Sequence, residues 1–247
     1  QARGKSRSES IDQIVANARA IAEMGVKEIV LTGVNIGDFG KYLDSQTGRF
    51  RRQTKFLTLL HALDAVEGID RIRISSIEPN LCDDEVIDFI SQSNTIVPHL
   101  HLPLQSGNDK QLEQMQRRYR RDLYADRVSA IKEKMPHANI GVDVIVGFPG
   151  ETDEDFAETY RFIQDLDVTY LHVFTYSERP NTPAYAMPGK VPMEVRRQRN
   201  KMLTILSEKK RRAFYEAFCG STRPVLFEKS THPGQMSGFT DNYLKVE

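Results

Sequence analysis

The sequence has only two cysteines, no long apolar run and no net charge. Cys82 and Cys219 lie far apart in the chain, a pattern typical of unrelated reduced thiols in a cytosolic protein and not of a metal site built from these two alone. No apolar run approaches the ~20 residues that cross a bilayer, and no secretory leader is visible, so we expect a cytoplasmic protein without membrane association. The 34 basic and 34 acidic residues cancel, so a nucleic-acid site must be a local patch.

The composition is that of a globular protein with a real core. Hydrophobic residues make up 39% and charged residues 28% of 247 residues, which suits one large α/β domain with a small appendage. The start, Gln-Ala-Arg-Gly-Lys-Ser-Arg-Ser, is polar and basic without an initiating methionine. We therefore expect that a longer chain has been cut here.

Strand-like and helix-like segments alternate along the chain. Five apolar runs predict strands: 28–32, 71–77, 97–104, 140–146 and 169–175. Helical spacing predicts helices at 9–25, 55–67, 83–93, 109–117, 121–135, 153–166 and 193–218. This alternation favours parallel strands with right-handed crossovers, as an incomplete or open β/α barrel or, alternatively, a doubly wound sheet.

Two segments depart from that alternation. Residues 41–53 form a polar, basic insertion that includes Arg49, Arg51 and Arg52. From Ser221 onwards, short strand-like runs with turn residues between them predict the start of a small β-domain. We expect a first domain at 1–218, including the long last helix, and an incomplete second one at 219–247.

Polar or glycine-rich segments follow several predicted strands, where α/β enzymes bind ligands. After 140–146, a Gly-Phe-Pro-Gly turn leads into a helix with an acidic first turn. Gln105 and Ser106 can hydrogen-bond a ribose or an amide, although a simple capped turn, with Ser106 or Asn108 capping the next helix, is the favoured interpretation of these residues alone. His99 and His101 share a strand face, but without a nearby third ligand we interpret them as core or surface histidines.

Basic residues cluster on the long last helix. From 194 to 212 there are eight basic residues against Glu194 and Glu208. A solvated face explains such a run, and phosphate-backbone binding is the alternative. The candidate RNA-binding residues are Arg196, Arg197, Arg199, Lys201, Lys209, Lys210, Arg211 and Arg212.

Four strings together resemble one family, the radical S-adenosylmethionine methylthiotransferases that modify tRNA. They are His-Leu-Pro-Leu-Gln-Ser-Gly-Asn-Asp (101–109), Met-Gln-Arg-Arg-Tyr (115–119), Asp-Val-Ile-Val-Gly-Phe-Pro-Gly-Glu-Thr (143–152) and Phe-Thr-Tyr-Ser-Glu-Arg-Pro-Asn-Thr-Pro-Ala (174–184). Residues 31–40 and 75–79 resemble the branch that acts on N6-threonylcarbamoyladenosine beside the anticodon. The tail from about 221 resembles the front of a TRAM domain, a small tRNA-binding β-barrel.

The resemblance implies an α/β fold: a partial (β/α)6-type radical-SAM barrel with parallel strands, followed by a TRAM-like C-terminal β-barrel. It also implies S-adenosylmethionine and, in a complete enzyme, two 4Fe-4S clusters. Their cysteine ligands are expected upstream of Gln1, so we expect no cluster, no metal ligand and no activity in this chain as it stands.

For the cofactor, the resemblance implies that Arg117 binds the carboxylate of S-adenosylmethionine. Gln105, Ser106 or Ser76 would bind the ribose, and adenine would lie on Ile145 and Val146 with backbone partners near Tyr176. The further cofactor-binding candidates are Gly33, Asn35, Asp143 and Ser177. A 5′-deoxyadenosyl radical would then take hydrogen from the adenine C2, with sulfur arriving by way of the second cluster.

Several readings remain open. The partner is expected to be tRNA, the chain is expected to be a monomer, and neither the electron donor nor the sulfur source can be named. The alternatives are a tRNA-binding module without catalysis, a methylthiotransferase acting on isopentenyladenosine, and a barrel enzyme that binds a phosphorylated metabolite.

Overall fold

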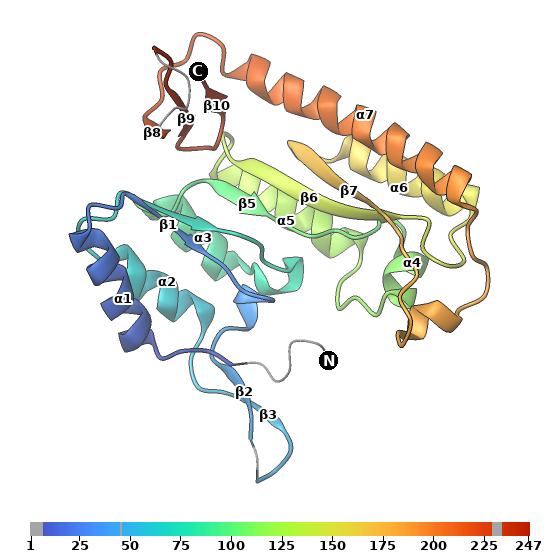
Figure 1. Cartoon of the computed structure of the whole chain (residues 1–247), viewed down its shortest axis with the longest axis horizontal. Coiled ribbons are helices and arrows are strands. Elements are labelled where there is room, and N and C mark those ends of the chain that lie inside the picture. The colour runs from blue at the N-terminus through green and yellow to red at the C-terminus, as the bar shows by residue number, and fades with distance from the viewer. Residues whose placement is uncertain (1–6, 45, 229–233) are drawn as a thin grey trace.

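Five parallel strands form the centre of the molecule (Figure 1), in a computed structural model that describes residues 7–44, 46–228 and 234–247. They are β1 (Glu28–Leu31), β4 (Arg71–Ile74), β5 (His99–His101), β6 (Asn139–Val146) and β7 (Tyr170–Thr175). β1 pairs with β4, and β5, β6 and β7 pair in that order, all parallel. A parallel bridge from Ile72 to Ile96 joins the two groups. The predicted parallel α/β arrangement is confirmed, whereas the partial-barrel shape stays a prediction.

Among the residues that the structure describes, seven helices accompany these strands, close to the predicted ranges. They are α1 (Ile11–Glu23), α2 (Phe56–Asp64), α3 (Asp84–Gln92), α4 (Asp109–Gln114), α5 (Arg121–Lys134), α6 (Asp153–Asp165) and α7 (Met193–Ala217). Short 3-10 helices lie after β1 (Ile36–Asp38), after β4 (Pro79–Leu81) and after β7 (Pro183–Ala186). Helix α6 begins with a capping box between Thr152 and Asp155, which fixes the start that the acidic first turn predicted.

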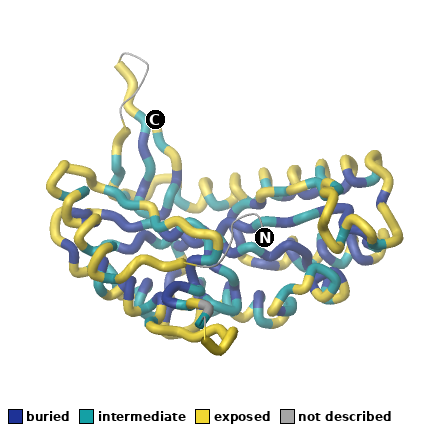
Figure 2. Tube along the Cα trace, turned by 60° about the horizontal axis from the view of Figure 1, so that its bottom comes forward, coloured by how far each residue is buried: buried dark blue, intermediate teal, exposed yellow. Residues whose placement is uncertain are grey.

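The two faces of the sheet differ in chemistry. Along β6 the fully buried side chains Ile140, Val142, Val144 and Val146 belong to one apolar core that also contains residues of α2, α3, α5, α6 and α7. Because successive strand residues point to opposite faces, Asp143 and Ile145 face the other side, where they are only half-buried. Figure 2 shows the strands buried while the outer turns of α7 are exposed. The second sheet face is therefore the open, polar one.

The basic insertion forms a β-hairpin, which periodicity did not predict. Strands β2 (Lys41–Leu43) and β3 (Phe50–Arg52) pair antiparallel. The hairpin follows β1 and projects beyond the carboxyl end of that strand (Figure 1).

The C-terminal residues form a three-stranded antiparallel sheet of β8 (Val225–Glu228), β9 (Ser237–Thr240) and β10 (Lys245–Val246). The predicted short strands are confirmed, while the likeness to a TRAM barrel and the domain bounds 1–218 and 219–247 stay predictions. Residues 229–233, which belong to the proposed second domain, and the first six residues of the polar start lie outside the described residues.

This small sheet is bound to the amino ends of the parallel strands, opposite to the hairpin (Figure 1). Arg71, the first residue of β4, donates to the carbonyls of Pro224 (2.9 Å), Phe239 (2.8 Å) and Thr240 (3.3 Å). The Tyr243 hydroxyl donates to Glu28 at the start of β1, over 2.6 Å. These buried contacts hold the small sheet in one orientation.

Candidate functional site

A cavity of about 750 Å³ opens at the carboxyl end of β1, beside α1. Its lining includes Thr32, Gly33, Asn35 and Asp38 from the loop that follows the strand. In parallel α/β proteins this edge of the sheet is where ligands bind. The structure thus places Gly33 and Asn35, both predicted from the sequence, at an open site.

A chain of polar contacts runs from this cavity across the rim of strand ends. The Asn35 amide donates to Asp38 (3.2 Å) and to Glu78 (3.3 Å), and Arg117 Nη1 lies 3.7 Å from Glu78 Oε1. Asn35 Oδ1 and Arg117 Nε are buried and have no hydrogen-bond partner among the described residues. Buried polar atoms are normally satisfied, so these two are exceptions, and both belong to half-buried side chains at the rim.

The turn that carries Arg117 is anchored to the exit of β5. The Tyr119 hydroxyl donates to the carbonyls of Pro103 (2.8 Å) and Leu104 (3.3 Å). Burial raises the pKa of Tyr119, which therefore stays a neutral donor. The Arg117 amide donates to Leu112 (2.9 Å), and Gln116 before it has φ 56°. The guanidinium is thus brought to the rim by the local backbone.

Gln105 is held at the rim by backbone contacts with β6. The Gln105 amide donates to the Asp143 carbonyl (2.8 Å), and the Gln105 carbonyl accepts from the Ile145 amide (2.9 Å). Gln105 has φ 71°, a conformation that non-glycine residues rarely adopt and that concentrates at functional sites. Gln105, Asp143 and Ile145, three of the cofactor-binding candidates, are therefore neighbours.

The predicted side-chain contacts of Ser106 and Val146 with the cofactor are wrong, because both side chains are buried. Ser106 is fully buried, where its hydroxyl lies 3.3 Å from the Thr159 hydroxyl and accepts from the Asn108 amide, so it has no surface to offer a ligand. The alternative, a capped turn, is confirmed because Asn108 caps α4. Val146 is fully buried in the apolar core, since the strand alternation turns it away from Ile145.

The remaining predicted residues lie just beyond β4 and β7. The Tyr176 amide donates to the Val146 carbonyl (2.9 Å), and its ring packs edge-on against Phe148. Its hydroxyl is buried without a partner in the described part of the chain. Ser76 is half-buried and Ser177 exposed. Tyr176 therefore extends the rim from β6 to β7.

The histidines on the open sheet face are paired with other side chains. His101 Nε2 lies 3.0 Å from Asp143 Oδ1, and His99 Nε2 lies 3.1 Å from the Tyr170 hydroxyl. Burial lowers the pKa of His99 to about 3, so its ring is neutral at physiological pH. The described residues contain no group of three histidine, cysteine or acidic side chains placed to hold a metal ion.

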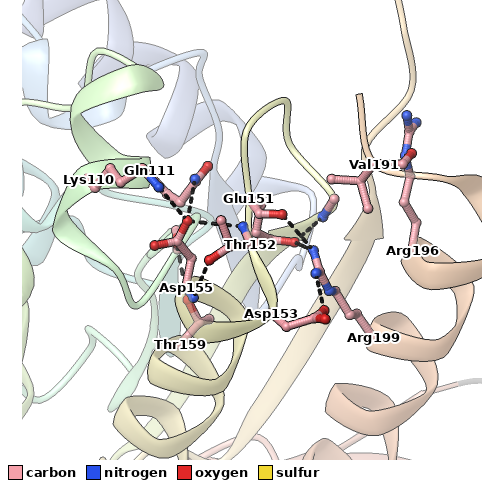
Figure 3. Close-up of polar contacts among 12 residues, drawn as sticks. Lys110, Gln111, Glu151, Thr152, Asp153, Asp155, Thr159, Val191, Arg196 and Arg199 are labelled. Atoms are coloured by element: carbon pink, nitrogen blue, oxygen red, sulfur yellow. Dashed lines mark hydrogen bonds and ion pairs between the residues drawn. The ribbon is translucent and has the colours of Figure 1, made fainter. Parts of the chain in front are cut away.

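The Gly-Phe-Pro-Gly corner is fixed by a buried ion pair and by a second pair with an exposed carboxylate (Figure 3). Glu151 accepts from the Gly147 amide (2.7 Å) and from Arg199 (2.5 Å), and Arg199 also binds Asp153 (2.7 Å). Burial nevertheless raises the pKa of Glu151. These contacts fasten the turn after β6 to helix α7.

The sequence predicted that Arg196 and Arg199 bind RNA, and this prediction is wrong. Both side chains bind carboxylates inside the protein. Both are less than 5% exposed. Arg196 binds Glu178 (2.5 Å) and donates to the carbonyls of Val191 and Tyr176. The sequence showed the cations but not their partner carboxylates, which lie 18 to 48 residues away.

Among the other candidates on α7, two have internal partners. Lys210 donates to the carbonyls of Gln164 (3.1 Å) and Leu166 (2.6 Å), and burial lowers its pKa. Arg212 binds Glu216 (2.7 Å) at the exposed surface, where such pairs stabilise little. The exposed cations that remain are Arg197, Lys201, Lys209 and Arg211.

Residues 1–163 match the sequence model of the radical SAM superfamily, and the chain belongs to this superfamily. The fold agrees: the radical S-adenosylmethionine methyltransferase TsrM from Kitasatospora setae aligns with a TM-score of 0.55 at 16% identity, over 72% of this chain and 33% of that one. Coproporphyrinogen III oxidase (HemN) from Escherichia coli aligns with a TM-score of 0.51 at 18% identity, over 84% of this chain and 46% of that one.

Within the superfamily, the chain is similar to tRNA methylthiotransferases over nearly its whole length, which confirms the resemblance. Threonylcarbamoyladenosine tRNA methylthiotransferase MtaB is 39% identical in Bacillus subtilis, over 99% of this chain and 54% of the relative. The MtaB of Aquifex aeolicus is 38% identical over 100% and 57%. The tRNA-2-methylthio-N(6)-dimethylallyladenosine synthase of Desulfitobacterium hafniense is 33% identical over 99% and 54%. The chain thus spans about half the length of these relatives.

Membership implies S-adenosylmethionine and a 4Fe-4S cluster in a complete enzyme, and the residues present fit only the first. The half-buried polar side chains of Asn35, Arg117 and Tyr176 at the strand-end rim suit a polar nucleoside ligand. By contrast, Cys82 is fully buried with its pKa raised to about 12 by burial, and Cys219 is exposed just after α7. These two thiols do not form a cluster site. No helix in the described ranges is long and apolar enough to span a bilayer.

Proposed function

We propose that this chain forms the S-adenosylmethionine- and tRNA-binding part of a methylthiotransferase that modifies C2 of N6-threonylcarbamoyladenosine beside the anticodon. The observation that carries the proposal is the polar chain from Asn35 through Glu78 to Arg117, which crosses the strand-end rim. The two MtaB relatives support the choice of nucleoside. In this proposal the parallel strands are part of a radical-SAM barrel, and residues 219–247 begin a TRAM-like unit.

S-adenosylmethionine supplies radical chemistry to enzymes of this superfamily, and the residues of this chain bind and orient it. Arg117 provides the cation for its carboxylate, since its half-buried guanidinium lies at the rim with a loose contact to Glu78, 3.7 Å away. Gln105 and Ser76 provide hydrogen bonds for the ribose hydroxyls. Ile145 provides the apolar surface for adenine, and Tyr176 lies at the neighbouring strand end.

Replacing Arg117 by glutamine is expected to weaken S-adenosylmethionine binding to the 247-residue chain by roughly 10-fold, as measured by calorimetry. A charge-assisted hydrogen bond contributes about 1.5 kcal/mol or more, and 1.4 kcal/mol corresponds to a factor of 10. Arg118→Gln is the matched control because Arg118 is exposed beside it. Equal affinities for the two variants would remove Arg117 from the site, and no binding to the parent chain would contradict the cofactor assignment.

The tRNA part of the proposal is tested with anticodon stem-loops that differ in one nucleoside. We expect the chain to bind a loop with N6-threonylcarbamoyladenosine more tightly than the same loop with N6-dimethylallyladenosine. The second nucleoside is a real competitor, because relatives named for it are 33% to 40% identical to this chain. The reverse order of affinities would favour the dimethylallyladenosine function, and a protein that binds S-adenosylmethionine but neither RNA would contradict a tRNA substrate.

A further inference from the structure

The β2–β3 hairpin is the most basic exposed element next to the cavity, and the function proposed above gives it no role. Between residues 41 and 55 there are five basic residues and one acidic residue, Asp44. In a chain with no net charge, this is a strong local excess. Such an excess attracts a polyanion through local electrostatics.

The hairpin also exposes aromatic surface between its cations. Phe50 is 61% exposed and Tyr42 is 42% exposed. Phe50 stands directly between Arg49 and Arg51 in the chain. Aromatic rings interleaved with cations are the pattern by which proteins hold single-stranded nucleic acid, since the rings stack on bases while the cations bind phosphates.

The base of the hairpin is fastened to the candidate site. Asp38, which lines the cavity, lies 3.4 Å from Lys41 Nζ and 3.3 Å from Arg52 Nη2. Asp38 also accepts from Asn35, which donates in turn to Glu78 on the rim. An isolated two-stranded hairpin is marginally stable in water. These contacts therefore orient the hairpin at the mouth of the cavity.

The outer cations of the hairpin remain available to a ligand. Arg49 forms no ion pair with any described residue, and Arg51 pairs only with Asp44, with a side chain that is still 60% exposed. Exposed pairs of this kind stabilise by about 0–1 kcal/mol, so phosphate contacts replace them readily. Lys41 and Arg52 are held by Asp38. Arg49, Phe50 and Arg51, at the start of β3, have exposed side chains.

We propose that the β2–β3 hairpin binds the single-stranded anticodon loop that flanks the nucleoside under modification. Phe50 stacks on an unpaired base, and Arg49 and Arg51 bind phosphates of the same loop. Because adjacent strand residues face opposite sides, Arg51 binds from the hairpin face that carries Tyr42. This inference rests on the proposed function, because it requires that RNA brings one nucleoside to the rim beside Asn35. An acidic protein segment would use the cations but leave the exposed ring without a stacking partner.

The test measures binding of a fluorescein-labelled anticodon stem-loop to the 247-residue chain over a range of salt concentrations. A fully paired RNA duplex with the same number of phosphates serves as the second probe. The variants are Arg49→Gln with Arg51→Gln, Phe50→Ala, and Phe50→Tyr, which retains an aromatic ring. The control is Lys134→Gln with Arg161→Gln on α5 and α6, two exposed cations outside the candidate RNA-binding residues.

We expect the double arginine variant to reduce the slope of log K against log salt by about 1.4, since each single-strand phosphate contact contributes ~0.7. Phe50→Ala should weaken binding of the stem-loop by roughly 5- to 100-fold, as loss of one stacked base does, without affecting the paired probe. Phe50→Tyr should bind like the parent chain.

The outcomes separate this inference from the proposed function. If the parent chain binds the stem-loop and both hairpin variants bind it equally well, the inference is overturned and the proposed function stands. If Phe50→Ala weakens the paired probe as much as the loop, base stacking is overturned. If the parent chain binds S-adenosylmethionine but no stem-loop, the hairpin inference and the tRNA substrate fail together.

Discussion

The Arg199→Met variant is expected to lose about 3–5 kcal/mol of unfolding free energy, the loss seen when one partner of a buried ion pair is removed. Arg199 Nη1 lies 2.5 Å from Glu151, whose side chain is only 1% exposed. Without the guanidinium, a buried carboxylate has only the Gly147 amide to stabilise its charge. Urea denaturation followed by circular dichroism measures the loss.

Arg197→Met is the matched control for this prediction, because the Arg197 side chain is 73% exposed on the same helix. Its unfolding free energy should change by less than about 0.5 kcal/mol. A loss in Arg199→Met no larger than that of the control would show that the Gly-Phe-Pro-Gly corner does not depend on this pair.

The loss in Arg199→Met should also depend on pH in a defined direction. Burial raises the pKa of Glu151 in the folded protein, so its contribution to stability is present at low pH and is lost as pH rises through that folded value. Removing the cation raises the pKa further. The difference from the parent chain should therefore be small near pH 4 and grow towards pH 7. A constant difference would contradict the role of Glu151.

Acidification from pH 7 to pH 4 is expected to cost the folded state on the order of 3 kcal/mol through His99 alone. Burial lowers the pKa of His99 to about 3, against 6.5 for an exposed histidine. His99 therefore binds a proton below pH 6.5 in the unfolded chain, but only below about pH 3 in the folded chain. Each pKa unit between these values contributes about 1.4 kcal/mol. Stability should fall as pH falls through this window.

The His99→Phe variant isolates that contribution, because it retains an aromatic ring beside Tyr170 and Tyr243 but cannot bind a proton. Its stability should depend less on pH than that of the parent chain between pH 6.5 and pH 4. His61→Phe is the control, since His61 is exposed and should leave the pH dependence unchanged. Identical pH profiles for the parent and His99→Phe would contradict the burial argument.

The order of strands and helices could be predicted because apolar spacing reports which elements form. The buried alternation in β6 and the capped start of α6 are local features of the sequence. The placement of Asn35 and Gln105 just after predicted strands followed from the same spacing, whereas Arg117, which follows α4, was predicted from the family resemblance. The hairpin could not be predicted, because β2 and β3 have three residues each and carry no clear alternation.

Side-chain roles were harder to predict than elements, for a physical reason. A run of cations on a helix does not show which of them face the core, and the carboxylates that bind Arg196 and Arg199 come from other segments. Likewise, adjacent residues such as Ile145 and Val146 face opposite sides of a strand. Which face each one takes is decided by tertiary packing.

Arg71 anchors the C-terminal sheet to the parallel strands, so two small units are held at opposite ends of these strands. The hairpin lies at their carboxyl end, and the small sheet lies at their amino end. The parallel strands set the distance between the two units. Under the proposed tRNA function, an RNA that contacts both would have to match that distance, and an RNA with a shortened stem would contact the hairpin alone.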